Sequence, residues 1–337
     1  MPANRLIQHY VDNARRLPWR SPPGTPPADP YRVWLSEIML QQTSVAAVIP
    51  RFERFIARWP TIEALAAASD EDILGEWAGL GYYARARNLV TCARAVAERG
   101  GFPAGEAELR TLPGVGDYTA AAIAAIAFGA RAAAVDTNVR RVVARLFALP
   151  APSRRDIAQR LQPWLAAVPP GDLTQALMDL GATICRPRAP RCGECPLNAD
   201  CASFSAGTPE MFPAPSAKRE RPQRHGLAYW HERDGQVRLV RRPARGLLGG
   251  MAALPVSAWN EHPVTTCAPV LGHVRHLFTH FALDLTIVAG NPPQADDGWW
   301  QPIATLHRAG LPTLFRRAAE QALAAPRERR AMLPPAA

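Results

Sequence analysis

Two carboxylates stand in apolar surroundings that would change their chemistry. Glu37 lies in the helical pattern WLSEIMLQ at residues 34–41, and burial there would raise its pKa, which suits a general acid. From periodicity alone, a surface glutamate on an amphipathic helix is an equal alternative. Asp136 lies in AAAVDTNV, just before a predicted helix over 139–149. It could cap that helix or hold a fixed negative charge against a developing cation, and the two roles are compatible.

A glycine turn, LPGVG at residues 112–116, comes before Asp136 and opens a helix rich in alanine and isoleucine. Glycines let backbone N–H groups approach a ligand closely, and the N-terminus of a helix favours an anion such as a phosphate. We therefore expect this stretch to hold a DNA backbone while Asp136 faces the sugar of a nucleotide.

Four of the six cysteines lie close together with the spacing C-x6-C-x2-C-x5-C. Thiolates in such a compact loop can hold either zinc or an iron–sulfur cluster, although the spacing is not that of paired zinc knuckles. Cys92 and Cys267 are isolated, and we interpret them as plain buried or half-buried thiols. The clustered cysteines are Cys185, Cys192, Cys195 and Cys201.

The composition favours a polyanionic partner. The chain has 337 residues, a net charge of +10 and an isoelectric point of about 9.9. A GC-rich genome would also enrich arginine, and Lys218 is the only lysine, so charge alone does not decide. The N-terminus lacks a secretory h-region, and no apolar run is long enough to cross a bilayer. We expect a soluble, cytoplasmic, nucleoid-associated protein.

The periodicity changes along the chain and predicts two domains. Roughly ten helical patterns and no strand-like alternation indicate an all-α domain over residues 1–204. A Pro-rich, charged stretch at 205–224 has the composition of a linker. An α+β domain is expected over 225–325, followed by a disordered tail over 326–337.

Within the second domain, Asp234-Gly235 is a hairpin signal between apolar runs at 227–230 and 237–240. Residues 274–288 include apolar side chains at period two, and residues 311–323 have a helical pattern.

Together, the segments TLPGVGDYTA, WLSEIMLQQT, GLGYYARARNL and VDTNVRRV and the cysteine spacing resemble the adenine DNA glycosylase (MutY) family of the helix-hairpin-helix superfamily. The resemblance covers the whole chain. It implies an all-α helix-hairpin-helix glycosylase domain with a [4Fe–4S] cluster loop at 185–201, then an α+β Nudix-like domain. The implied activity is hydrolysis of the N-glycosidic bond of adenine mispaired with 8-oxoguanine or guanine in double-stranded DNA, during base-excision repair, by a monomer.

The resemblance also implies catalytic roles. Glu37 would protonate adenine at N7, Asp136 would stabilise the sugar cation, and Asn138 would orient the site. Tyr118 occupies the position where bifunctional relatives such as endonuclease III carry a lysine that cleaves the strand through a Schiff base. Since residues 1–205 contain no lysine, we expect base release by hydrolysis that stops at an abasic site.

Further residues match family positions that bind DNA, the base or the cluster. Phe278-Thr279-His280 matches a loop that senses 8-oxoguanine, with Thr279 in place of the usual serine. No Nudix set of carboxylates follows Leu248, so we expect recognition there rather than pyrophosphate hydrolysis. The implied contacts are Gln42 and Tyr82 as wedges, Trp19 and Arg20 at the adenine pocket, Leu112, Gly114, Val115 and Gly116 at the backbone, and the four clustered cysteines on the [4Fe–4S] cluster. Separately from the resemblance, Arg186, Arg188 and Arg191 lie between the clustered cysteines, where they could contact phosphates or form a solvated basic loop.

Three other functions fit parts of this pattern. A thymine-mismatch glycosylase and an endonuclease III-type lyase share the superfamily, but the missing lysine argues against the lyase and the Nudix-like domain against both. A non-catalytic iron–sulfur DNA-binding protein is a rival of another class, and the presence of both Glu37 and Asp136 argues against it.

Overall fold

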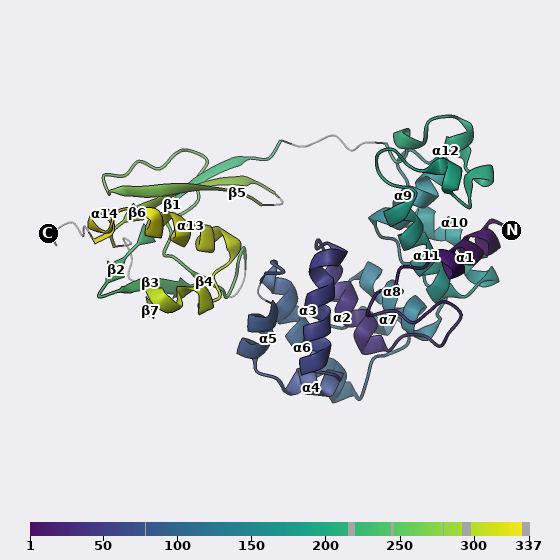
Figure 1. Ribbon diagram of the computed structural model, residues 1–337, viewed down its shortest axis with the longest axis horizontal. Coiled ribbons are helices and arrows are strands. Elements are labelled where there is room, and N and C mark those ends of the chain that lie inside the picture. Colours follow the sequence, from purple (N-terminus) through teal and green to yellow (C-terminus); the bar gives the residue numbers. More distant parts are fainter. Residues whose placement is uncertain (78, 215–219, 244–245, 279, 292–297, 332–337) are drawn as a thin grey trace. The chain divides into compact units, whose positions relative to one another are not determined.

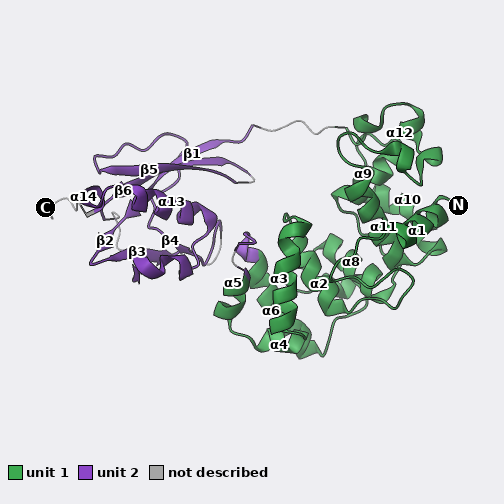
Figure 2. Cartoon of the chain, viewed as in Figure 1, with its two compact units in different colours: residues 1–76, 85–217 green, residues 77–84, 218–337 purple. Residues whose placement is uncertain are grey.

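The computed structural model describes residues 1–77, 79–214, 220–243, 246–278, 280–291 and 298–331. The chain forms two compact units (Figure 2). The helical unit comprises residues 1–76 and 85–217, and the strand unit comprises residues 77–84 and 218–337. Among the described residues, no helix is long and apolar enough to cross a membrane.

Helices make up the regular structure of the described part of the helical unit (Figure 1). The α-helices are α1 (Pro2–Asn13), α2 (Pro30–Leu40), α3 (Val45–Arg58), α4 (Ile62–Ala67), α5 (Asp70–Trp77), α6 (Tyr83–Arg99), α7 (Glu106–Leu109), α8 (Asp117–Phe128), α9 (Thr137–Leu146), α10 (Arg154–Ala167), α11 (Pro170–Thr183) and α12 (Ala202–Ser205). Short 3-10 turns follow at η1 (Cys192–Glu194), η2 (Asn198–Asp200) and η3 (Pro209–Met211).

Local sequence explains where several of these helices begin. Asp29 accepts hydrogen bonds from the first amides of α2, and Pro30 at the first position supplies a helical φ without an N–H that would need a partner. Ser44 caps α3 and Thr61 caps α4 in the same way. Ser153 forms a reciprocal capping box with Asp156 at the start of α10.

Helix α8 lies at the centre of the helical unit, and small residues let its neighbours approach closely. It packs against α2, α7 and α11, and α11 also packs against α9. A Cβ atom on Gly181 of α11 would lie 2.6 Å from Asn138 Cβ, and one on Gly171 would lie 2.9 Å from the Ala125 carbonyl oxygen. These contacts fix the N-terminus of α9, which carries Asp136, against the central helix.

The strand unit contains two small sheets packed around one core. Strands β1 (Gln223–Trp230), β6 (Ala282–Ala289) and β5 (Val270–Leu277) form one sheet, in which β1 and β6 are parallel and β5 and β6 form an antiparallel hairpin. The second sheet has β3 (Gln236–Arg241) between β7 (Gly298–Pro302) and both β2 (Glu232–Arg233) and β4 (Ala252–Ala253). The 3-10 helix η4 (Ile303–Arg308) and the helices α13 (Thr313–Ala324) and α14 (Arg327–Ala331) complete the unit.

The fold class predicted from the sequence is confirmed: a helical domain is followed by an α+β domain. The hairpin at Asp234-Gly235 is present between β2 and β3, and both residues have the positive φ of that turn. The apolar run 227–230 is a strand but does not pair with β3. It belongs to the other sheet and runs parallel to β6, a long-range pairing that local alternation does not encode.

Two boundary predictions differ from the structure. The predicted linker is too long, because Ala214 N donates to the Pro150 carbonyl at 2.7 Å and β1 already starts at Gln223. The predicted disordered tail contains helix α14, whose Arg330 faces Glu232 at 3.8 Å, with both side chains largely buried. Residues 332–337 lie outside the described residues.

Candidate active site

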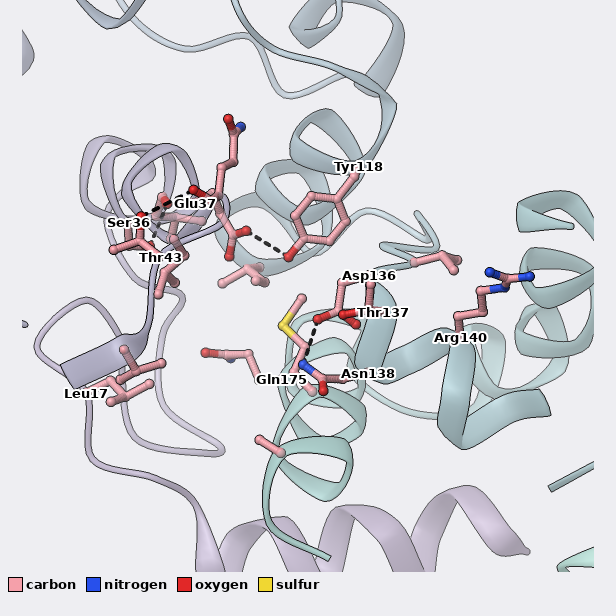
Figure 3. A pocket seen from close by; sticks show the side chains of 18 of the residues that line it. Leu17, Ser36, Glu37, Thr43, Tyr118, Asp136, Thr137, Asn138, Arg140 and Gln175 are labelled. Atoms are coloured by element: carbon pink, nitrogen blue, oxygen red, sulfur yellow. Dashed lines mark hydrogen bonds between the residues drawn. The ribbon is translucent and has the colours of Figure 1, made fainter. Parts of the chain in front are cut away.

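A cleft of about 1100 Å³ opens in the helical unit between α2, α8, α9 and α11 (Figure 3). It collects residues that are far apart in the sequence, because α2 and α11 both pack on α8. All the predicted catalytic residues line it, together with both residues predicted for the adenine pocket and one predicted wedge: Glu37, Tyr118, Asp136, Asn138, Trp19, Arg20 and Gln42.

Glu37 is buried in the wall of the cleft, with 7% of its surface exposed. Burial raises its pKa from 4.5 to about 7, and the negative charge of Asp136 adds to the rise. A hydrogen bond from Tyr118 and the charge of Arg20 act in the opposite direction. Near neutral pH, Glu37 therefore exists in both protonated and ionised forms, as a general acid requires.

The Tyr118 hydroxyl donates to Glu37 Oε2 at 2.8 Å (Figure 3). Burial raises the pKa of Tyr118 well above 10, and the charges of Glu37 and Asp136 add to the rise. The hydroxyl therefore remains protonated, and it acts as the donor when the Glu37 carboxylate is ionised. Tyr118 therefore sets how readily Glu37 holds its proton.

Replacing Tyr118 by phenylalanine should raise the pKa of Glu37. Loss of a hydrogen bond to a charged group destabilises the carboxylate, so a rise of about one unit is expected. The pKa can be followed by carbon NMR of the Glu37 carboxyl, with Glu37→Gln used to assign the signal. An unchanged or lower pKa in Tyr118→Phe would show that the hydroxyl does not control this carboxyl.

Asp136 is the N-cap of α9, and both of its carboxylate oxygens are held. Oδ1 accepts from the Val139 amide at 2.6 Å, and Oδ2 accepts from Asn138 Nδ2 at 3.0 Å. The cap fixes the carboxylate at the cleft wall. The capping role and the proposed electrostatic role are thus compatible in this geometry.

A chain of hydrogen bonds continues from Asn138 into the neighbouring structure. Arg141 Nη2 donates to Asn138 Oδ1 at 2.8 Å and to the Gly181 carbonyl at 2.7 Å, and its Nε donates to the Cys185 carbonyl at 2.7 Å. Asn138 is therefore oriented with its amide towards Asp136, and the first residue of the cysteine loop is tied to the same helix.

A buried ion pair holds the loop on the opposite side of the cleft. Asp179 of α11 accepts from Arg20 Nη1 at 2.8 Å and from Arg15 Nε at 2.6 Å. Asp179 and Arg20 are both less than a tenth exposed at the side chain. The neighbouring Trp19 is buried and meets the Phe52 ring edge-to-face at 5.2 Å, so most of this indole lies in the core.

The four clustered cysteines line a second, small pocket of mostly apolar character. Burial raises the pKa of Cys195 to about 11, and it also raises the pKa values of Cys185 and Cys192. These thiols would not ionise unaided at neutral pH, so they suit ligands whose proton is displaced by a metal. The apolar part of the wall is Val142, Leu146, Leu180, Ile184, Leu197, Phe204 and Pro209.

Arg145 is the buried residue that binds the cysteine loop to α9. It is 3% exposed, and it donates to the carbonyls of Arg186 at 2.6 Å, Pro187 at 2.9 Å and Phe212 at 3.0 Å. Its Nη1 also lies 3.5 Å from Cys185 Sγ. One side chain thus satisfies several carbonyls of a segment with little regular structure.

Replacing Arg145 by methionine should destabilise the helical unit by about 3 kcal/mol, because buried carbonyls lose a charged donor. For a unit of this size the loss corresponds to a fall of about 6–12 °C in melting temperature. Arg160→Met is the control, since that arginine is exposed and stacks over Phe147 without the buried carbonyl contacts of Arg145. Equal melting temperatures for the two variants would contradict the assigned role.

Comparison with known proteins identifies the family. The model of the HhH-GPD superfamily of base excision DNA repair proteins matches residues 35–167, and that of the NUDIX domain matches residues 226–321. The chain is 36% identical to the adenine DNA glycosylase of Homo sapiens, over 93% of this chain and 72% of that protein. It is 44% identical to that of Mycolicibacterium smegmatis, over 64% of this chain and 72% of that protein. The chain belongs to the adenine DNA glycosylase family.

Solved structures agree with this assignment at the level of the helical fold. A thermostable thymine-DNA glycosylase superposes with a TM-score of 0.53 and 30% identity, covering 60% of this chain and 95% of that one. An endonuclease III–DNA covalent intermediate gives a TM-score of 0.51 at 24% identity, over 61% and 94% of the two chains, and shows the fold alone.

In this member of the adenine glycosylase family, the two residues expected to act as wedges have the same unusual backbone conformation. Gln42 and Tyr82 have φ values of 55° and 47°, in the left-handed region of backbone conformation. Residues other than glycine rarely adopt this conformation, and those that do are often at functional sites. Both are exposed, Tyr82 at 53%. Arg85 holds the end of α2 before Gln42 by donating to the Ile38 and Met39 carbonyls at 2.8 and 3.0 Å.

The glycine turn lies between α7 and α8, outside the cleft. Gly114 has φ 75°, and a Cβ atom there would lie 2.7 Å from Asn88 Cβ, so both conformation and space require glycine. Leu112 and Val115 are buried, and they anchor the turn rather than offer side chains to DNA. Gly116 is the N-cap residue of α8 and is exposed, as is Asp117, the first residue of the helix.

The residues expected to sense the opposite base are in the strand unit. Phe278 is half-buried and stacks on Trp259 with ring centroids 5.8 Å apart, and His280 is exposed. Thr279 lies outside the described residues. On the cysteine loop, Arg191 pairs with Glu194 and Arg186 donates to the Ala189 carbonyl at 2.9 Å, while Arg188 is exposed.

Several polar residues in and around this adenine glycosylase site were not predicted from the sequence. Gln175 and Asp179 of α11 are only 6% and 7% exposed; Gln175 lines the cleft, and Asp179 binds Arg20, which also lines it. Two polar residues four positions apart in the apolar run LTQALMDLG were a detectable signal of a polar helix face. Arg141 and Arg145 have the same spacing on α9, but arginine is ordinary on a helix surface, and their burial depends on the fold of the cysteine loop.

Proposed function

We propose that this family member is a monofunctional glycosylase that acts on 8-oxoguanine:adenine and guanine:adenine mispairs in duplex DNA. It hydrolyses the N-glycosidic bond of the mispaired adenine. The observation that carries the proposal is the pairing of Glu37, with a pKa near 7, and the fixed carboxylate of Asp136 in one cleft. Burial favours the protonated form of Glu37, while the Val139 amide and the Asn138 side chain hold the carboxylate of Asp136 in place.

The proposed reaction starts with adenine extruded into the cleft. Glu37 donates its proton to N7 as the bond between C1′ and N9 breaks, and the bonding electron pair leaves with the base. Positive charge develops on the sugar, and Asp136 stabilises it. Water then adds at C1′, and the carboxylate of Glu37 can take up the released proton, which restores the acid and leaves an abasic site.

Gln175 is the side chain we propose to recognise the adenine edge. It reaches into the cavity from α11 (Figure 3), and its Nε2 has only a long bond of 3.3 Å to the Gly171 carbonyl. A side-chain amide offers a donor and an acceptor together, which matches the paired acceptor and donor of an adenine edge.

We infer that the four cysteines hold a [4Fe–4S] cluster rather than a single zinc ion. In the described part of the chain, no group of three or more His, Cys, Asp or Glu side chains is arranged to hold one metal ion. A single zinc draws its thiolates to about 2.3 Å from the metal, whereas a four-iron cluster takes thiolates that are further apart. When bound, the cluster would supply the covalent connections that keep the loop 185–201 folded.

We place recognition of the opposite base in the strand unit, at Phe278, Thr279 and His280, and insertion into the duplex at Gln42 and Tyr82. An exposed aromatic on a strained turn suits a wedge that fills the gap left by an extruded base. Because the helical domain has no lysine, the chain cannot form the Schiff base of a strand-cleaving lyase there.

The test uses labelled duplexes with adenine opposite 8-oxoguanine, guanine or thymine. We expect adenine release from the first two and none from the adenine:thymine pair. The labelled strand should break only after alkali treatment, because an intact abasic site breaks in alkali. Strand cleavage without alkali, or release of thymine from a guanine:thymine duplex, would contradict the proposal.

A further inference from the structure

The lining of the cleft carries positive charge that the proposed chemistry does not use. Four arginines line the cleft: Arg15, Arg20, Arg140 and Arg154. Arg15 and Arg20 are both bound to the buried Asp179, so their guanidinium groups are already engaged by a carboxylate. We propose that the other two bind phosphate groups of the DNA strand that carries the extruded nucleotide, and that Asp117 competes with the phosphate for Arg154. This inference rests on the proposed function.

Arg140 lies one helical turn beyond Asp136. The Arg140 amide donates to the Asp136 carbonyl at 3.0 Å, and four residues advance an α-helix by about 6 Å. Figure 3 shows the Arg140 side chain projecting from α9 beyond Asp136 and Thr137. A sugar held against Asp136 would therefore have its flanking phosphate within reach of this guanidinium.

The Arg140 side chain is exposed, and no carboxylate within 4 Å pairs with it among the described residues. A guanidinium binds phosphate oxygens through two parallel N–H groups and keeps its charge at every relevant pH. Such a group at the edge of a nucleotide-sized cleft, next to the residue assigned to the sugar, is placed for the backbone of the same nucleotide.

Arg154 is the first residue of α10 and also lines the cleft. Its Nη1 lies 3.6 Å from Asp117 Oδ2, and the side chains are 47% and 65% exposed. An ion pair this exposed is weak, so a phosphate can replace the carboxylate. Asp117 directly follows the glycine turn and also pairs with Arg110 at 3.5 Å, so its negative charge stands where the turn would meet DNA.

Two consequences follow for the reaction. The phosphates remain after the base has left, so Arg140 and Arg154 would bind the abasic product as well as the substrate. Asp117 would weaken both complexes, because the phosphate must displace it from Arg154.

The experiment measures binding of an 8-oxoguanine:adenine duplex by fluorescence anisotropy, in the Glu37→Gln background so that the base stays in place. Salt is varied over roughly 50–200 mM. Arg140→Ala should weaken binding about tenfold and reduce the slope of log affinity against log salt by about one. Arg154→Ala should act in the same direction, Arg140→Lys should recover part of the affinity, and Asp117→Asn should bind more tightly than the background.

Arg155→Ala is the matched control, because it removes the same charge from the neighbouring position of α10, which does not line the cleft. The inference is overturned if Arg140→Ala has the affinity and salt slope of Arg155→Ala, or if Asp117→Asn binds no more tightly. The wild-type chain is assayed for adenine release on the same duplex. Absence of release would count against the proposed function, whereas release with unchanged Arg140→Ala binding would count against this inference alone.

Discussion

The Glu37→Gln variant should bind the mispaired duplex as tightly as the wild-type chain and release adenine about 10³-fold more slowly. Glutamine keeps the shape of the side chain and can still accept from Tyr118, but it has no proton to give to N7. The loss should appear in the single-turnover rate and not in the dissociation constant, because the missing interaction is made in the transition state.

The same variant should be more stable than the wild type at high pH. The native pKa of Glu37 is raised from 4.5 to about 7, so the native state binds more protons than the unfolded state between these values. Stability from this group is fully present below pH 4.5 and is lost as the pH rises through 7. Glu37→Gln should therefore gain about 3 kcal/mol over the wild type by about pH 8. Denaturant unfolding at two pH values measures this gain, and a gain that does not grow with pH would argue against a buried, ionisable Glu37.

The second large effect is expected for Asp136→Asn, which should slow adenine release by about 10²–10³-fold. The substitution removes the negative charge that we propose stabilises the sugar cation, but it leaves an oxygen that can still cap the Val139 amide. The amide of the new residue would meet the Asn138 amide, which now donates to Oδ2 at 3.0 Å, so Asn138 must turn. Capping is retained, and the melting temperature should change little.

Asn138→Ala provides the comparison for Asp136→Asn. It removes the donor to Asp136 and the acceptor of Arg141 but leaves the carboxylate in place. The rate of adenine release should fall less in Asn138→Ala than in Asp136→Asn. If the two variants lose the same rate, orientation of the site rather than the charge of Asp136 would account for the effect.

The sequence was sufficient for the elements whose signals are local. Asp136 precedes a predicted helix and is the N-cap of α9, and Asp234-Gly235 marks a hairpin that the structure contains. The fold class follows from the change of periodicity after residue 205 together with the family resemblance. These features depend on neighbouring residues alone.

Features that depend on long-range packing could not be predicted in the same way. The parallel pairing of β1 with β6 joins segments some sixty positions apart, as in Gln223 with Ala282, and leaves no local pattern. The cleft lies between α2, α8, α9 and α11, and Gln175 lines it because α11 packs on α8. Arg145 resembles any helix-surface arginine in sequence, and its burial arises only when the cysteine loop folds over α9.

The most direct test of the central claim is the pH dependence of single-turnover adenine release by the wild-type chain. In the proposed mechanism the protonated form of Glu37 is the active one, so the rate should be constant at low pH, bend near pH 7 and then fall tenfold for each further unit. A rate that stays constant to about pH 9, two units above this pKa, would contradict Glu37 as the acid that releases the base.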